Sequence, residues 1–195
     1  MIIGITGGTG SGKTTLLNEI KNRGGIVIDC DAVYHELVQT DKDLLAAIEN
    51  RFPGTVENGS LLRKKLGAIV FSDEEALKDL NAITHAAVKK AVLDRIPENP
   101  ALVAIDAIGL FEGDLAELCN VTVAVTAPRE MRVKRLMVRD GISEEYARKR
   151  IAAQHSDHWF RKKCDYVLVN DEKLDAFATK CIAFLKELGI MEEKM

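Results

Sequence analysis

Residues 4–15, GITGGTGSGKTT, place glycine, lysine and threonine at a spacing that can hold a phosphate group. Gly7 is followed after four residues by Gly12, Lys13 and Thr14, which is the spacing of a phosphate-binding loop. Glycines let such a loop turn tightly, so that backbone N–H groups converge on phosphate oxygens at the N-terminus of the helix that follows. Lys13 adds a positive charge, and the Thr14 hydroxyl is placed to bind Mg²⁺.

The context of the loop favours this interpretation over a glycine-rich turn that merely connects two elements. An apolar run at 2–6 precedes the loop, and a helical stretch near 13–23 follows it, as the phosphate-binding mechanism requires. We therefore predict that the chain binds ATP with Mg²⁺, and that catalytic Lys13 lies among the nucleotide contacts. The predicted contacts are Gly8, Thr9, Gly10, Ser11, Gly12, Lys13, Thr14 and Thr15.

Other users of a phosphate loop fit the chain less well. A guanine-specific switch carries an Asn/Thr-Lys-x-Asp element after a later strand, and the only similar stretch, 40–43, has the wrong spacing and place. A motor would be expected to be larger and to carry coupling elements. A small phosphotransferase is the remaining class.

A phosphotransferase must also hold an acceptor hydroxyl and exclude water. Asp29 and Asp31 stand two residues apart at the end of an apolar run, so they can project to the same side. A carboxylate there can orient the hydroxyl or accept its proton. The alternative is a helix cap plus a surface acid. Asp31 is the better candidate, and Asp106 and Asn170 end two later apolar runs.

A basic block lies between 129 and 150. Arg132, Arg135 and Arg139 recur at three- and four-residue spacing and so share one helical face, just before Asp140 and Gly141. The face is either solvated or belongs to a lid that closes over the phosphates. On the lid interpretation, Arg139, nearest the glycine, stabilises the transferred charge.

The elements that position these residues follow an α/β pattern. Short runs rich in Val and Ile predict strands at 2–6, 26–30, 101–106, 121–126 and 165–169, alternating with helical stretches near 13–23, 31–39, 42–51, 60–70, 74–95, 129–139, 144–158 and 172–188. This alternation predicts a doubly wound, mainly parallel five-stranded sheet of the P-loop NTPase-like type. In such sheets ligands bind at the carboxyl ends of the strands.

One domain is expected over 1–195. Its core comprises 1–30, 97–127 and 164–195, with an acceptor-binding helical insertion at 31–96 and a helical lid at 128–163. The last five residues, MEEKM, read as a solvated end.

The composition limits the cellular compartment and the classes of binding partner that we expect for the protein. The 195 residues are 47% hydrophobic, and a formal net charge of -3 speaks against a nucleic-acid binder. The four cysteines form no CxxC pair, and no apolar run approaches the roughly 20 residues of a membrane span. With no signal sequence before the first strand, we expect a cytoplasmic protein that acts on a small molecule, as a monomer or small homo-oligomer, without nucleic-acid or membrane partners.

Nearly the whole chain resembles the dephospho-coenzyme A kinase family. The similar segments, in order, are GITGGTGSGKTT, VIDCDAVYHELV, NGSLLRKKLGAIVF, LNAITHAAV, AIDAIGLFEG, RLMVRDGISEEYARKRIAAQ and CDYVLVND. The resemblance implies ATP-dependent phosphorylation of the ribose 3′-hydroxyl of dephospho-coenzyme A. It makes Asp31 the proposed base and Arg139 the lid arginine.

The resemblance also implies the remaining roles. Arg63 and His85 would hold the acceptor, Asp106 would belong to the substrate-binding set, and Asn170 would lie near the adenine of ATP. The chain departs from the family pattern on the acceptor side. Ala86 replaces a proline of the family pattern, and Ile108-Gly109 replaces Pro-Leu. Leu62 replaces an acidic residue or asparagine.

Several alternatives stay open at this level. By itself, His85 is more typical of a capping or packing histidine than of a ligand. His155 and His158, one turn apart, suggest half a zinc site, but no matching Cys or His pair accompanies them, which favours a structural or lid role. The rival functions are a nucleoside or nucleotide kinase with another acceptor, and a non-catalytic ATP-binding regulatory protein. Any of Asp29, Asp31 and Asp106 can still be the base.

Overall fold

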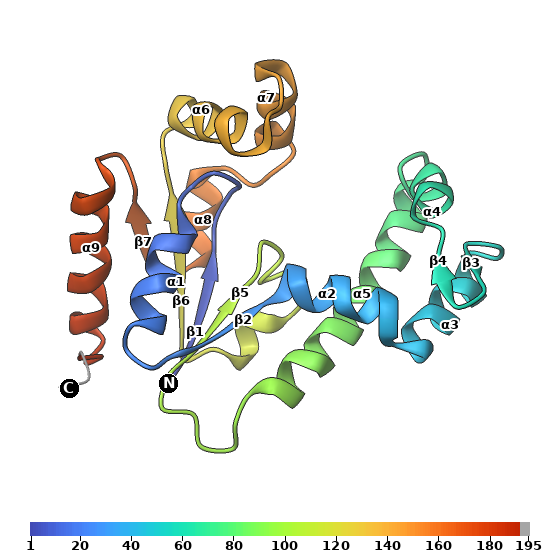
Figure 1. Cartoon of the computed structure of the whole chain (residues 1–195), viewed down its shortest axis with the longest axis horizontal. Helices are drawn as coiled ribbons and strands as arrows, with labels where there is room; N and C mark the ends of the chain where they lie inside the picture. Colours follow the sequence, from blue (N-terminus) through green and yellow to red (C-terminus); the bar gives the residue numbers. More distant parts are fainter. Residues whose placement is uncertain (192–195) are drawn as a thin grey trace.

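The computed structural model describes residues 1–191, so the end of the predicted core segment and of the MEEKM tail, 192–195, lies outside the described residues. The chain forms a five-stranded sheet of order β2-β5-β1-β6-β7 (Figure 1). The strands are β1 (Ile2–Thr6), β2 (Ile26–Asp29), β5 (Val103–Asp106), β6 (Val121–Thr126) and β7 (Tyr166–Val169). Every pairing in this sheet is parallel, which confirms the predicted fold class.

The sheet is buried on both faces, as its apolar strands require. On one face α1 (Lys13–Lys21) and α9 (Leu174–Glu187) pack together over a cluster that includes Ile3, Ile5 and Phe177. On the other face α2 (Cys30–Thr40) and α5 (Glu74–Arg95) contribute to a second cluster with strand residues such as Ile105. A 3₁₀ turn, η1 (Leu115–Leu118), and α8 (Asp157–Lys163) complete the core.

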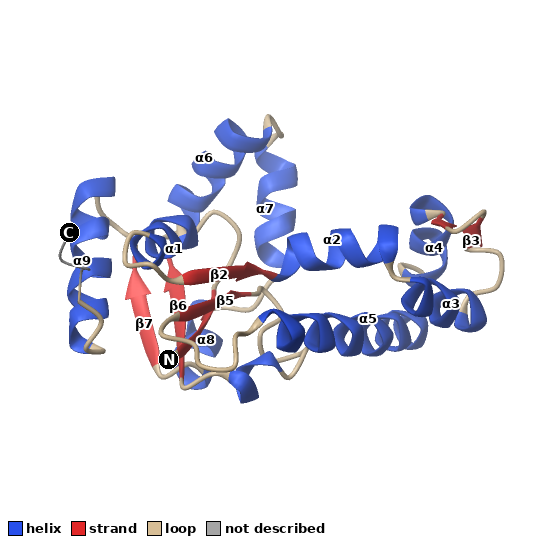
Figure 2. Cartoon of the chain, turned by 60° about the horizontal axis from the view of Figure 1, so that its bottom comes forward, coloured by secondary structure: helices blue, strands red, loops and turns tan. Residues whose placement is uncertain are grey.

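Two helical parts extend from the sheet. Beyond α2, the segment from α3 (Lys42–Arg51) through the hairpin β3 (Val56–Glu57) and β4 (Ser60–Leu61) to α4 (Arg63–Val70) lies at the far end of α5 (Figures 1 and 2). We call this segment together with α2 and α5 the arm. On the other side of the sheet's carboxyl edge, α6 (Arg129–Asp140) and α7 (Glu144–Ala152) pack on each other through Val133, Leu136, Ala147 and Ile151; we call these two helices the lid.

The structure corrects two predicted helices. The helix predicted at 60–70 begins only at Arg63, because Asn58 and Gly59, with φ of 51° and 74°, close a β-hairpin before it. Asn-Gly at the tip of a hairpin is a recognised turn signal that the helical pattern masked. The helix predicted at 144–158 is two helices, because Ser156 begins α8 by accepting a hydrogen bond from the Trp159 amide.

Candidate active site

The phosphate loop lies between β1 and α1 and depends on its glycines. Gly7 has φ +135°, and a Cβ there would lie 2.1 Å from the Val125 carbonyl oxygen. Gly12 has φ +100°, and a Cβ there would lie 2.2 Å from the Asn170 side-chain nitrogen. Only glycine fits both the backbone conformation and the space. The Lys13 ammonium lies across the loop and donates to the Gly7 carbonyl at 3.1 Å.

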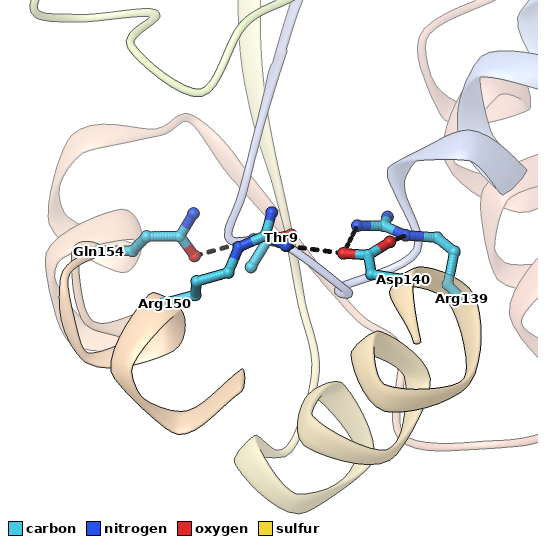
Figure 3. A network of polar contacts seen from close by, with 5 residues as sticks. All are labelled: Thr9, Arg139, Asp140, Arg150 and Gln154. Carbon is cyan, nitrogen blue, oxygen red and sulfur yellow. Dashed lines mark hydrogen bonds and ion pairs between the residues drawn. The ribbon is translucent and has the colours of Figure 1, made fainter. Parts of the chain in front are cut away.

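Side chains from behind the loop hold its carbonyl groups. Arg132 Nε donates to Thr9 O at 2.9 Å and its Nη2 to Gln154 Oε1 at 2.8 Å. The same Gln154 oxygen accepts from the Thr9 amide (Figure 3). Arg135 Nη1 donates to Gly10 O at 3.2 Å. The side-chain amide of Asn170 donates to Ser11 O at 2.8 Å. These bonds fix the loop before any ligand arrives.

Two of these residues are buried against the phosphate loop. Arg132 is only 5% exposed and donates a hydrogen bond to the backbone of the loop. It therefore does not share one phosphate-facing surface with Arg135 and Arg139. Asn170, which the family resemblance places near adenine, is 4% exposed and lies against Gly12 and Arg135. Both positions are set by tertiary contacts that helical periodicity does not reveal.

A cavity of about 740 Å³ opens in front of the loop; we call it the loop cavity. Its size is within the usual range for small-molecule sites. Loop, strand-end and lid residues line it together: Thr9, Gly10, Ser11, Gly12, Lys13, Thr14, Asp31, Asp106, Ile108, Lys134, Arg135, Val138, Arg139 and Arg150. The cavity thus brings most of the predicted nucleotide contacts together with Asp31, Asp106 and Arg139.

A second cavity of about 320 Å³, the arm cavity, adjoins it between α2, α5 and the segment after β5. Tyr34, Asn81 and His85 line it, and Asp31 lines both cavities. The His85 Nδ1 lies 3.0 Å from the Glu112 carbonyl oxygen, which orients the ring. Arg63, at the exposed start of α4, lines neither cavity.

The three candidate carboxylates have different surroundings. Asp29 caps α2, because its Oδ1 accepts from the Ala32 amide at 3.0 Å. Asp31 is exposed in the first turn of the same helix. Asp106 Oδ1 is buried and has no hydrogen-bond partner among the described residues. Burial raises the pKa of Asp106 to about 6; Lys13 acts against this rise, whereas Asp29 and Asp31 add to it.

These residues fit a magnesium ion. Mg²⁺ prefers oxygen ligands and usually takes only one or two from protein groups. Thr14 and Asp106 line the same loop cavity, and Asp106 Oδ1 has no hydrogen-bond partner among the described residues, so the two side chains can serve as ligands. No group of three or more His, Cys, Asp or Glu side chains in the described part of the chain forms a metal cluster. His155 instead stacks on Trp159 with ring centroids 3.7 Å apart and contacts Glu112.

Arg150, a residue of the basic block with no predicted role of its own, lines the loop cavity. Gly141, with φ 64°, turns the chain so that α7 returns along α6. Arg150 thereby comes close to Arg139, and both guanidinium groups bond to Asp140 (Figure 3). Periodicity within one helix cannot reveal a partner on the next helix; the Asp140-Gly141 turn was the only available signal.

A phosphate loop facing carboxylates and lid arginines at the carboxyl edge of a parallel sheet defines a small P-loop kinase. Among the described residues, no helix is both long and apolar enough to cross a membrane.

Comparisons with known proteins give the particular family. The family model described as dephospho-CoA kinase matches residues 1–176. A dephospho-CoA kinase from Corynebacterium diphtheriae is 37% identical over 180 residues, covering 89% of this chain and 90% of the relative. A crystal structure of a Thermus thermophilus protein superposes with a TM-score of 0.79 at 36% identity, covering 96% of this chain and 97% of that one. Dephospho-CoA kinase from Campylobacter jejuni superposes with a TM-score of 0.68 at 26% identity, covering 97% and 98%. The chain belongs to the dephospho-CoA kinase family.

Proposed function

We propose that this protein transfers the γ-phosphoryl group of ATP to the 3′-hydroxyl of dephospho-coenzyme A, giving coenzyme A and ADP. The observation that carries the proposal is the position of Asp31, which borders both the loop cavity and the arm cavity. A donor phosphate in the first cavity and an acceptor hydroxyl in the second would meet beside this carboxylate. Family membership supports the choice of acceptor.

The loop cavity is the donor site in this proposal. Lys13 and the loop N–H groups would bind the phosphates of ATP, and the Lys13 ammonium would exchange its Gly7 carbonyl partner for phosphate oxygens. Thr14 and Asp106 would hold Mg²⁺, so that Asp106 contributes to substrate binding through the ion. When bound, the ion neutralises charge on the phosphate oxygens. Arg139 would stabilise the charge on the phosphoryl group as it moves.

The arm cavity is the acceptor site. Asp31 would orient the acceptor hydroxyl and take its proton, because it is exposed and free of the helix-capping bond that engages Asp29. His85 would contact the acceptor from the wall of the cavity. Arg63, the first residue of α4, lines neither cavity, so its predicted contact would be with a part of the acceptor that lies outside the arm cavity.

We further propose a cytoplasmic enzyme that acts as a monomer or small homo-oligomer and needs neither nucleic acid nor membrane. The net charge of -3, which provides no general basic field, supports the part of this proposal that concerns nucleic acid.

The test is an assay of purified protein with Mg-ATP and dephospho-coenzyme A, in which mass spectrometry follows coenzyme A and ADP. We expect equimolar formation of both products. Turnover of a nucleoside panel in place of dephospho-coenzyme A would contradict the assigned acceptor. Binding of ATP without any phosphorylated product would support the regulatory alternative.

A further inference from the structure

Asp140 occupies an unfavourable position for an acidic residue. It is the last residue of α6, where the helix dipole disfavours negative charge. Its carboxylate is nevertheless well satisfied: Oδ1 and Oδ2 accept from Nε and Nη2 of Arg139 at 2.6 and 3.0 Å, and Oδ2 also accepts from Nη1 of Arg150 at 2.7 Å. Helix stability alone does not explain this placement.

The geometry separates the carboxylate from the cavity that its partners line. Arg139 and Arg150 both line the loop cavity, whereas Asp140 does not. The Asp140 side chain is 22% exposed, against 60% for Arg139 and 38% for Arg150. The Asp140 carboxylate lies between the two arginines and bonds to guanidinium groups from two different helices (Figure 3).

The bonds to Asp140 leave donors for a ligand. A guanidinium has five N–H groups, of which Asp140 engages two on Arg139 and one on Arg150. The remaining N–H groups of two adjacent, oriented guanidinium groups match the oxygens of a phosphoryl group. Arg148, by contrast, bonds to Glu130 and Glu144 and lines neither cavity.

We propose that Arg150 is a second phosphoryl-binding residue and that Asp140 is a positioning residue, which holds Arg139 and Arg150 as a paired clamp for the γ-phosphoryl group in the loop cavity. The inference rests on the proposed function in one respect only, namely that the cavity binds ATP. A clamp held in place before binding avoids ordering two flexible side chains during the reaction.

The test compares Asp140→Asn with the wild-type enzyme in the presence of Mg²⁺. Calorimetry measures the affinity for ADP and for the non-hydrolysable analogue AMP-PNP, and kinetics with dephospho-coenzyme A give kcat and KM. We expect affinity for AMP-PNP to fall about tenfold while affinity for ADP, which lacks the γ-phosphoryl group, changes less than about twofold. We expect kcat to fall about tenfold, because orientation of the arginines is lost. The binding comparison needs no acceptor, so it stands even if dephospho-coenzyme A proves to be the wrong substrate.

Two further variants make the result specific. Glu145→Gln removes another acidic partner on the lid, paired with Lys149 in an exposed ion pair, and should change neither affinity nor kcat. In an Arg139→Met/Arg150→Met background, Asp140→Asn should cause no additional loss, because a positioning residue acts only through its partners.

Three results would overturn the proposal. One is tighter binding of AMP-PNP by Asp140→Asn, which would mean that the carboxylate masks the arginines. Another is an equal loss of ADP and AMP-PNP affinity together with a lower melting temperature, which would mean a purely structural role. The third is a further loss of AMP-PNP affinity in the background that lacks both arginines.

Discussion

The phosphate loop with the lid and the arm with the arm cavity differ in how far their binding residues are already in position without ligand. The phosphate loop is held by hydrogen bonds from the side chains of Arg132, Arg135, Asn170 and Gln154, so the donor site is formed without ligand. On the arm, Arg63 lies in neither cavity, and Phe71 at the end of α4 is 86% exposed. The donor site is thus preorganised, whereas the acceptor contacts predicted on the arm are not gathered around one cavity. Substitutions on the two sides should therefore fail in different ways.

The largest effect on activity is expected at Asp31, where the loop cavity and the arm cavity meet. Asp31→Asn keeps the size of the side chain but removes the group that takes the hydroxyl proton. We expect kcat to fall about 10³-fold, within the usual range for loss of a general base. ATP affinity, measured by calorimetry, should stay within about twofold, because Asp31 is not a phosphate ligand. A large loss of ATP affinity with kcat unchanged would remove Asp31 from its proposed role.

The next largest effect tests how strictly the loop is preorganised. Gly12→Ala introduces a Cβ 2.2 Å from the buried Asn170 amide at φ +100°. We expect ATP affinity to fall about 100-fold, because the loop must shift away from its phosphate-binding shape. The matched variant is Gly59→Ala on the arm, where φ is +74° and no atom lies within 4 Å. It should lower stability slightly and leave ATP affinity unchanged; similar affinities in the two variants would show that the loop is not held rigidly.

Asp106→Asn should separate stability from activity. The pKa of this carboxyl is raised from 3.8 to about 6, so the folded chain binds its proton more tightly than the unfolded chain does. The stabilising contribution of the group is present below pH 3.8 and is lost as the pH rises toward 6. Without nucleotide at pH 8, the variant should gain roughly 3 kcal/mol in free energy of unfolding, since the pKa is raised by about two units and one unit corresponds to about 1.4 kcal/mol.

Chemical denaturation at a series of pH values measures this gain, which should vanish at the acid end of the range. Turnover with Mg-ATP should fall, because a metal ligand is lost. Exposed Asp94→Asn is the control, and it should change neither quantity. A destabilised Asp106→Asn at pH 8 would mean that the carboxylate has a stabilising partner in solution.

The smallest effect is expected at the end of the arm. Arg63→Ala should raise the KM for dephospho-coenzyme A about tenfold and leave the KM for ATP unchanged, since one charged contact contributes on the order of 1–2 kcal/mol. Lys64→Ala, an exposed neighbour on the same helix, is the control. An unchanged acceptor KM in Arg63→Ala would mean that α4 does not reach the acceptor, and would weaken the contrast between the two sides.

The sequence predicted the sheet and the donor half better than the rest, for physical reasons. The phosphate loop is local, because its glycines, Lys13 and Thr14 follow one another along the chain. Parallel strands buried on both faces leave a clear apolar pattern, and all five were found within two residues of their bounds. Such features need no knowledge of distant contacts.

Features that depend on tertiary contacts were harder to predict. Arg132 and Arg139 share the same helical spacing, yet one is buried against Thr9 and the other lines the loop cavity. The burial that raises the pKa of Asp106 arises only when the sheet and its helices assemble. The roles of Arg63, His85 and Asn170 stay predictions, because they concern contacts with ligands.

On the proposed mechanism, donor and acceptor occupy adjoining cavities at the same time, and the phosphoryl group passes directly between them beside Asp31. The stereochemical course of the reaction tests this claim most directly. ATP made chiral at the γ-phosphorus with oxygen isotopes is turned over with dephospho-coenzyme A, and the configuration of the product 3′-phosphate is determined. A single in-line transfer predicts inversion at phosphorus. Retention would require a second displacement through a phosphorylated enzyme and would contradict the account.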